Sequence, residues 1–250
     1  MNVESEQTTD TSSLPRDAAF WAQSVDRLSV TDTPSGATNL NVDGRQTVGP
    51  LQGFGQLWQK TYRIRLEGAT ATAIEVVQVW KEHFPEFQPP SNRFYPSVAG
   101  VQPGEVVLIN AMTPGGPVST GVMVLYSDEE AFTLMTPEGH PESGWVTFSA
   151  YEEDGLTVAQ VQSLARANDP IYEAAFHVIG SNLQEKIWKH VLTSLAAHFG
   201  VEQAVTLDKT CVDPKLQWSR MGNIRHNAQI RTLLYTLAAP FRWIRGIFSS

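Results

Sequence analysis

The stretch that decides the fold is Gly139-His140-Pro141-Glu142-Ser143-Gly144-Trp145-Val146-Thr147-Phe148, a polar turn between two glycines that runs directly into an apolar segment. Glycine supplies unusual φ values and proline stiffens a loop, so the first six residues predict a tight turn. The β-branched and aromatic residues that follow predict a strand that begins at Trp145.

Outward from this turn, the chain alternates between short apolar segments and turn residues. Strands are predicted at residues 57–66, 105–110, 118–126, 131–135 and 145–151. Spacers this short imply antiparallel neighbours. Residues 157–167 fit a helix or a last strand, and the pattern leaves both open.

Two segments have the apolar spacing of helices. Residues 70–84 place apolar side chains on one face, with a threonine cap before them and Pro85 after them. Residues 181–199 carry a broader apolar face, with Ser181 as a cap and Gly200 as a terminator. A face that wide predicts a helix that packs on a sheet.

The order of strand, helix, antiparallel strands and long helix resembles the helix-grip fold of the START-like (SRPBCC) superfamily. Residues 139–144 resemble the characteristic run of an uncharacterised bacterial family, domain of unknown function 1990, and the similarity extends through 148–150, 169–170 and 183–195. The resemblance implies an α+β fold in which a curved antiparallel sheet wraps around a long C-terminal helix. It also implies a cavity between sheet and helix that often holds an apolar ligand.

The expected organisation has three parts. Residues 1–50 are rich in Ser, Thr, Asp and Gly and are predicted to be mostly disordered. Residues 51–200 form the START-like helix-grip domain, and residues 201–250 form a basic amphipathic, helical C-terminal extension.

Charge and composition exclude several classes of protein. A formal net charge of -8 argues against nucleic-acid binding, which needs a basic surface. The single cysteine, Cys211, fits a reducing compartment. The N-terminus lacks the pattern of a secretory signal, and no run of about 18 apolar residues occurs, so a cytoplasmic protein is expected.

His140 and Glu142 are the candidates for chemistry. A strand-like backbone would point both side chains to the same side, and a His-carboxylate pair can do acid-base work near neutral pH. The alternative, which the turn residues favour, is a structural role for the whole loop. The histidine spacing contains no metal-binding motif, so neither a metal nor a cofactor is expected.

An apolar cavity needs a lining, and the chain has aromatic residues suited to it. The predicted lining consists of Trp80, Phe84, Phe94, Tyr95, Trp145, Phe148 and Trp188. Ordinary core packing is the alternative for each of these side chains.

The C-terminal extension combines an apolar stripe with basic residues. Six basic residues and no acidic ones follow Asp213. The residues that would touch a membrane or a partner are Arg231, Leu234, Leu237, Phe241, Arg242, Trp243 and Arg245. A basic amphipathic segment suits peripheral contact of residues 225–250 with an anionic membrane, and the alternative is docking on its own domain or on a second subunit.

The leading hypothesis is therefore a non-catalytic START-like protein that binds a small apolar molecule or lipid between its sheet and its long helix. The first alternative is an enzyme of cyclase, hydrolase or lyase type that uses His140 and Glu142. The second is a partner-binding module that acts through residues 201–250.

Overall fold

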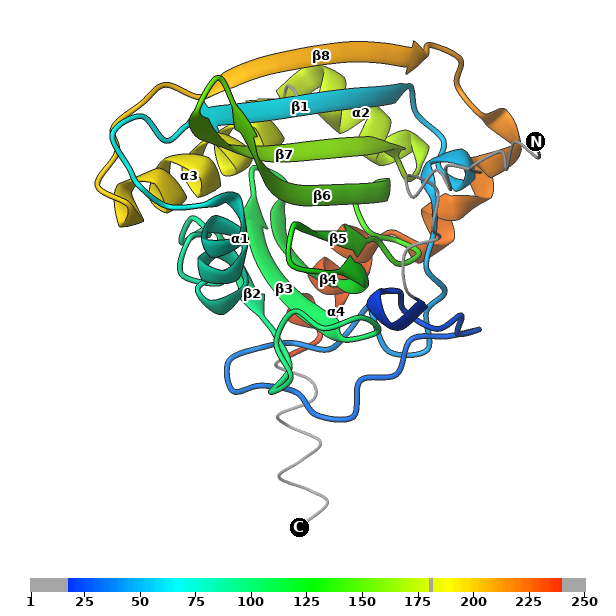
Figure 1. The fold of residues 1–250 in the computed structure, drawn as a ribbon. Coiled ribbons are helices and arrows are strands. Elements are labelled where there is room, and N and C mark those ends of the chain that lie inside the picture. Colours follow the sequence, from blue (N-terminus) through cyan, green and yellow to red (C-terminus); the bar gives the residue numbers. More distant parts are fainter. Residues whose placement is uncertain (1–17, 180–181, 240–250) are drawn as a thin grey trace, which may run out of the picture.

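A computed structural model describes residues 18–179 and 182–239 (Figure 1). One antiparallel sheet of eight strands, in the order β2-β3-β4-β5-β6-β7-β1-β8, forms its centre. The strands are β1 (Leu57–Arg65), β2 (Asn92–Tyr95), β3 (Val106–Thr113), β4 (Gly116–Ser127), β5 (Ala131–Met135), β6 (Glu142–Glu153), β7 (Leu156–Ala167) and β8 (Thr206–Asp213). The helices are α1 (Ala73–Glu82), α2 (Pro170–Ile179), α3 (Asn182–His198) and α4 (Ala228–Leu237), with 3-10 turns η2 (Ala18–Phe20), η3 (Pro50–Gln52) and η4 (Trp218–His226). The fold class is α+β, as predicted.

The segment that the sequence left open, residues 157–167, is strand β7. It lies between β6 and β1 and pairs with both, so it is an inner strand of the sheet. Its neighbour β6 begins at Glu142, three residues earlier than predicted, because Glu142 already pairs with Ala167. The second half of the Gly139–Gly144 turn is therefore strand.

The helices α1 and α3 pack against the same face of the sheet. Trp188, Val191, Leu192 and Leu195 of α3 and Trp80 of α1 belong to one buried cluster together with side chains of the strands. The sheet curves around this layer (Figure 1), which is the helix-grip arrangement that the resemblance implied. We call the face that carries α1 and α3 the concave face.

Helix α1 begins as its sequence predicts. The side chain of Thr72 accepts a hydrogen bond from the backbone N–H of Glu75, and the Glu75 side chain accepts one from the backbone N–H of Thr72. This reciprocal capping box satisfies two backbone donors that the helix itself leaves without partners.

The described part of the N-terminal segment, residues 18–50, differs from the disorder expected there. It runs along the convex face of β3 and β4, where Leu28 and Val42 form a second buried cluster with Leu108 and Met123. A few apolar anchors spaced along a polar segment are enough to order it, because the sheet supplies the rest of the apolar surface.

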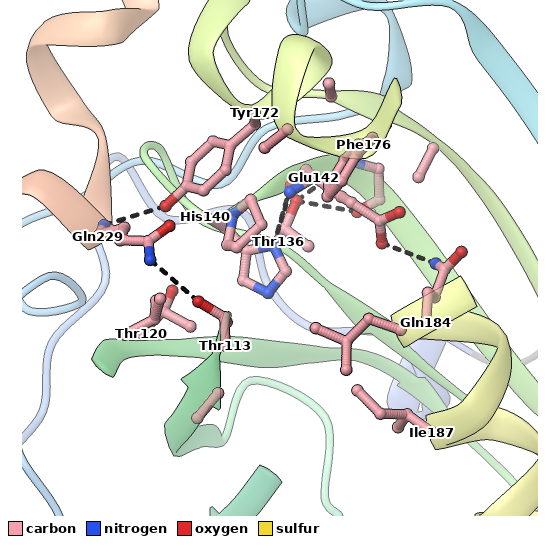
Figure 2. A pocket seen from close by; sticks show the side chains of 18 of the residues that line it. Thr113, Thr120, Thr136, His140, Glu142, Tyr172, Phe176, Gln184, Ile187 and Gln229 are labelled. Carbon is pink, nitrogen blue, oxygen red and sulfur yellow. Dashed lines mark hydrogen bonds between the residues drawn. The ribbon is translucent and has the colours of Figure 1, made fainter. Parts of the chain in front are cut away.

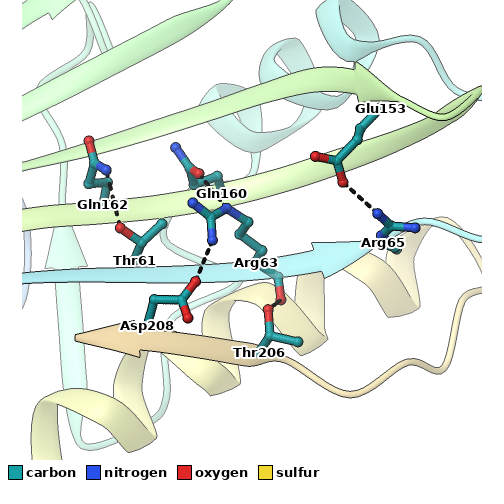
Figure 3. Close-up of polar contacts among 8 residues, drawn as sticks. All are labelled: Thr61, Arg63, Arg65, Glu153, Gln160, Gln162, Thr206 and Asp208. Carbon is teal, nitrogen blue, oxygen red and sulfur yellow. Dashed lines mark hydrogen bonds and ion pairs between the residues drawn. The ribbon is translucent and has the colours of Figure 1, made fainter. Parts of the chain in front are cut away.

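The C-terminal extension contains a strand that the sequence analysis missed. Strand β8 pairs with β1 along its length and forms one edge of the sheet. Strands β1 and β7 carry polar side chains on the convex face (Figure 3), where Arg63 of β1 bonds to Asp208 of β8 at 2.6 Å and Arg65 of β1 bonds to Glu153 of β6 at 2.5 Å. Polar residues alternate with the apolar ones of the concave face, so β8 shows no continuous apolar run.

Helix α4 is fixed by a buried polar network at its first turns. The side-chain amide of Asn41 donates to the carbonyl oxygens of Ser119 and Ala228, and the guanidinium of Arg231 donates to Asn41 Oδ1. Ala228 and Thr232 are buried, whereas Leu234 and Leu237 are 62% and 71% exposed. The helix therefore docks through its small and polar side and leaves most of its apolar stripe uncovered.

The turn at Gly139 gives the first prediction. Gly139 has φ 85°, and a Cβ there would collide with the carbonyl oxygen of His226. Gly155, in the hairpin between β6 and β7, has φ 74° and open space around it. Gly155→Ala should cost about 1–2 kcal/mol for the left-handed backbone alone. Gly139→Ala should cost about 1–3 kcal/mol more, because the C-terminal segment must move.

Urea unfolding of the two variants measures this difference directly. A matching loss of unfolding free energy in Gly139→Ala and Gly155→Ala would show that the C-terminal segment does not rest on the turn.

Candidate ligand-binding cavity

A cavity of about 600 Å³ lies between the concave face, α2, α3 and α4 (Figure 2). Sites for small molecules commonly have volumes of about 300–1,000 Å³. Its apolar walls include Ile109, Val118, Val122, Leu134, Phe176 and Ile187. The cavity is thus large enough for a small organic molecule and mostly apolar.

The strand register places two charged side chains on this wall. Glu142 lies on β6 two residues before Gly144 and four before Val146, both of which also line the cavity. Lys60 lies on β1 two residues before Tyr62, a member of the buried cluster of the concave face. Because side chains alternate along a strand, Glu142 and Lys60 both face inward.

Gln184 of α3 joins these two charges. The Lys60 ammonium donates to Gln184 Oε1 at 2.6 Å, and Gln184 Nε2 donates to Glu142 Oε2 at 2.8 Å. Lys60 is only 8% exposed. A buried ammonium and carboxylate are therefore connected through one amide, which lowers the cost of removing each from water.

Burial raises the pKa of Glu142 above its ordinary value, because the ionised carboxylate loses its hydration. The charge of Lys60 and the hydrogen bond from Gln184 act against this rise in the pKa. Desolvation is the largest of the three effects. The carboxyl group thus holds its proton to a higher pH than an exposed glutamate does.

His140 also faces the cavity, from the turn that precedes β6. Its Nδ1 lies 3.1 Å from the backbone nitrogen and 3.0 Å from the backbone oxygen of Glu142, so one of these two hydrogen bonds occupies it. Burial lowers the pKa of His140 to about 4, although the bond to the Glu142 backbone opposes this. The imidazole is therefore neutral near pH 7.

The wall opposite Glu142 is held together by Gln229 of α4. Its backbone N–H donates to the hydroxyl of Tyr172 on α2 at 3.0 Å, and its side-chain amide donates to Thr113 Oγ1 at 2.9 Å (Figure 2). These bonds tie α4, α2 and the hairpin between β3 and β4 together. The C-terminal extension is thus a wall of the cavity.

The aromatic residues predicted to line the cavity fall into three groups. Phe94 and Trp188 line it, and the backbone of β6 at Trp145 contributes to the wall while the indole ring lies beside Gly49. Trp80, Phe84 and Phe148 are instead packed in the solid core. Tyr95 lies outside the cavity, beside Gly36 on the convex side.

His140 and Glu142, the candidates from the sequence, both line the cavity, whereas the sequence analysis did not single out Lys60, Gln184 or Gln229. The signal for Lys60 was present, since a lysine stands among the inward positions of an otherwise apolar strand face. Gln184 and Gln229 gave no comparable signal, because their roles depend on contacts between distant segments.

Two further findings concern the rest of the chain. In the part of the chain that the structure describes, no group of three or more His, Cys, Asp or Glu side chains is arranged to hold a metal ion. None of the described helices is long and apolar enough to cross a membrane. The predicted tail residues Phe241, Arg242, Trp243 and Arg245 lie outside the described residues.

No family model and no curated protein matches this chain. Among the solved structures that resemble it is the di-domain ARO/CYC StfQ from the steffimycin biosynthetic pathway, with 14% identity and a TM-score of 0.43 over 58% of this chain and 50% of that one. TTHA0849 from Thermus thermophilus has 13% identity and a TM-score of 0.43 over 56% of this chain and 96% of its own. Major latex-like protein 151 from Panax ginseng has 12% identity and a TM-score of 0.39 over 58% of this chain and 99% of its own. The match thus spans half of the StfQ chain and nearly all of the other two. Structural similarity at such low identity shows neither a ligand nor a reaction of this chain. The similarity to domain of unknown function 1990 stays a prediction.

The lowered pKa of His140 predicts a pH dependence of stability. An unfolded histidine takes up its proton near pH 6.5, whereas His140 in the native state does so at about 4. Between these pH values the unfolded state binds the extra proton, so the free energy of unfolding falls as the pH falls. The variant His140→Gln should lose less unfolding free energy over this interval than the wild type.

Urea unfolding at a series of pH values provides the measurement, with His190→Gln on the exposed side of α3 as the control. Equal pH slopes for the wild type and His140→Gln would contradict the burial of a neutral imidazole at this position.

Proposed function

We propose that this protein is a non-catalytic carrier or sensor that binds a small, mostly apolar molecule in the cavity between its sheet and its helices. The observation that carries this proposal is the combination of about 600 Å³ of space with mostly apolar walls and a few convergent polar groups. Burial of apolar ligand surface there would supply the affinity, and the polar groups would orient the ligand.

The architecture supports the same proposal. The aromatic core fills the concave face beside α1, yet the part of that face between α2, α3 and α4 is hollow. Protein interiors are normally close-packed, so a space of this size inside the fold points to a molecule that occupies it.

Filling the cavity provides the test. Purified protein is incubated with a lipid extract, separated from unbound material and analysed by mass spectrometry. The wild type should retain specific small molecules, and Val146→Trp, which places an indole in the cavity, should retain far less. Val212→Trp, at an exposed position on β8, is the matched control.

Absence of retained molecules in the wild type would count against the proposal, as would equal retention by Val146→Trp and the wild type.

One observation favours a second candidate, an enzyme of cyclase, hydrolase or lyase type. His140 and Glu142 both face the cavity, which such an enzyme requires. A neutral imidazole can accept a proton from a bound molecule, and a carboxyl group with a raised pKa can donate one. The same two groups can equally bind a polar atom of a ligand without any reaction.

A peripheral membrane contact through the C-terminal extension is part of the proposal. Exposed apolar side chains line the cavity on three elements, namely Met112 (59% exposed), Ile171 (42%) and Ile230 (36%). Leu234 and Leu237 are further exposed apolar side chains on α4, the helix that carries Ile230. Since the chain has only basic charges after Asp213, an anionic lipid surface is the complementary partner.

Vesicle sedimentation tests this contact. The double variant Leu234→Asp/Leu237→Asp should bind vesicles of phosphatidylserine and phosphatidylcholine at least about tenfold more weakly, because two charges replace the apolar stripe. Val98→Asp, fully exposed and away from the cavity, should bind like the wild type.

If the wild type binds neither these vesicles nor vesicles of phosphatidylcholine alone, the membrane contact is ruled out. If it binds vesicles of phosphatidylcholine alone, the contact does not depend on charge.

A further inference from the structure

The polar end of the cavity combines Lys60, Gln184, Glu142 and His140 (Figure 2 shows the last three). We infer that the molecule bound in the cavity is electrically neutral and carries a hydroxyl group that meets Glu142 and His140, an inference that rests on the proposed function. The site would therefore discriminate against fatty acids and other carboxylates.

The first argument is charge balance. Charged side chains on the cavity wall have partners within the protein. Lys60 and Glu142 are joined through Gln184. The other pairs are the Arg166 guanidinium with the Asp213 carboxylate at 3.1 Å, the Lys209 ammonium with the Glu185 carboxylate at 3.4 Å, and the Glu173 carboxylate with the His177 imidazole at 3.1 Å. A ligand with its own charge would add an uncompensated ion to a poorly hydrated site. That is costly, because an ion loses far more hydration than a neutral polar group does.

The second argument is the free hydrogen-bonding capacity. Within the described residues, Glu142 uses Oε2 for Gln184 and His140 uses Nδ1 for the Glu142 backbone, whereas Glu142 Oε1 and His140 Nε2 have no protein partner. Both side chains border the cavity. At this end of the cavity, the polar atoms left for a ligand are thus one carboxylate oxygen and one imidazole nitrogen. Elsewhere among the described lining residues, the uncharged atoms Thr120 Oγ1 and Trp188 Nε1 also have no partner, as do Nε and Nη1 of Arg166, whose side chain packs beside Gly53.

A hydroxyl group suits this pair of atoms. It can donate to the carboxylate oxygen and accept from the imidazole when the proton is on Nε2. When the imidazole carries its proton on Nδ1, the hydroxyl can donate to Nε2 instead. A ligand carboxylate has no proton to donate, and it would face the ionised form of Glu142 as a like charge.

The test uses three probes with the same ring system: 2-naphthol, 2-methylnaphthalene and 2-naphthoate. Near neutral pH the first is a neutral alcohol, the second has a methyl group in place of the hydroxyl, and the third is an anion. Equilibrium dialysis measures the affinity of each for the full chain. We expect 2-naphthol to bind at least about tenfold more tightly than either of the others, a difference equivalent to about 1.4 kcal/mol.

Glu142→Gln separates binding chemistry from a structural role. This variant removes the negative charge while keeping the shape, so it should weaken binding of 2-naphthol and leave 2-methylnaphthalene unchanged. It also leaves Lys60 without a carboxylate, so binding of 2-naphthoate should become tighter than in the wild type. Glu153→Gln, on the exposed end of the same strand, is the matched control and should change none of the three affinities.

The wild-type comparison tests the inference even if Glu142→Gln does not fold. Binding of 2-methylnaphthalene or 2-naphthoate by the wild type as tightly as 2-naphthol would overturn the inference and leave the proposed function intact. Equal weakening of all three probes by Glu142→Gln would also overturn it. If none of the probes binds and the lipid extract leaves nothing on the protein, the proposed function itself fails.

Discussion

The packing of aromatic rings on the concave face is the constraint on which the rest of the structure depends. Phe132 and Phe148, on neighbouring strands, stack with ring centroids 4.6 Å apart. Trp80 of α1 and Phe84 meet Phe148 edge-to-face at 5.3 Å and 5.2 Å. These contacts hold α1 against β6 and fill the concave face beside α1. The cavity lies on another part of that face, between α2, α3 and α4.

The boundary between the solid and the hollow part is also aromatic. Phe94 and Trp188 touch the ring cluster and line the cavity at the same time. Beyond them the alternation of the strands continues, but inward positions carry Glu142 and Lys60 in place of apolar residues. The fold tolerates them because Gln184 of α3 connects the two, so neither charge is left alone in a poorly hydrated site.

The chain segments on either side of the helix-grip core complete the cavity. Asn41 of the N-terminal segment holds α4 in place, and the backbone N–H of Ala228 bonds to the carbonyl oxygen of Gly139 at 2.9 Å. The Gly139–Gly144 turn therefore has two structural tasks, since it starts β6 and supports the C-terminal segment. A functional role for His140 and Glu142 is compatible with both tasks, because their side chains point into the cavity while their backbones form the turn.

The sequence by itself determined many of the local elements: β1, β3, β4, β5 and β6 from their apolar and turn residues, α1 from its capping threonine, α3 from its broad apolar face, and the turn from its glycines. It left β7 open between helix and strand and did not predict β2, β8 or α2. It also marked His140 and Glu142, and Lys60 stood visibly on an apolar strand face. Only the tertiary structure decided which aromatic residues fill the core and which line a cavity, because Trp80 and Trp188 are equally apolar and differ only in what lies opposite them. It likewise decided the place of β8, the order of residues 18–50 and the roles of Gln184 and Gln229. Each of these depends on contacts between segments far apart in the chain, and local periodicity carries no information about such contacts.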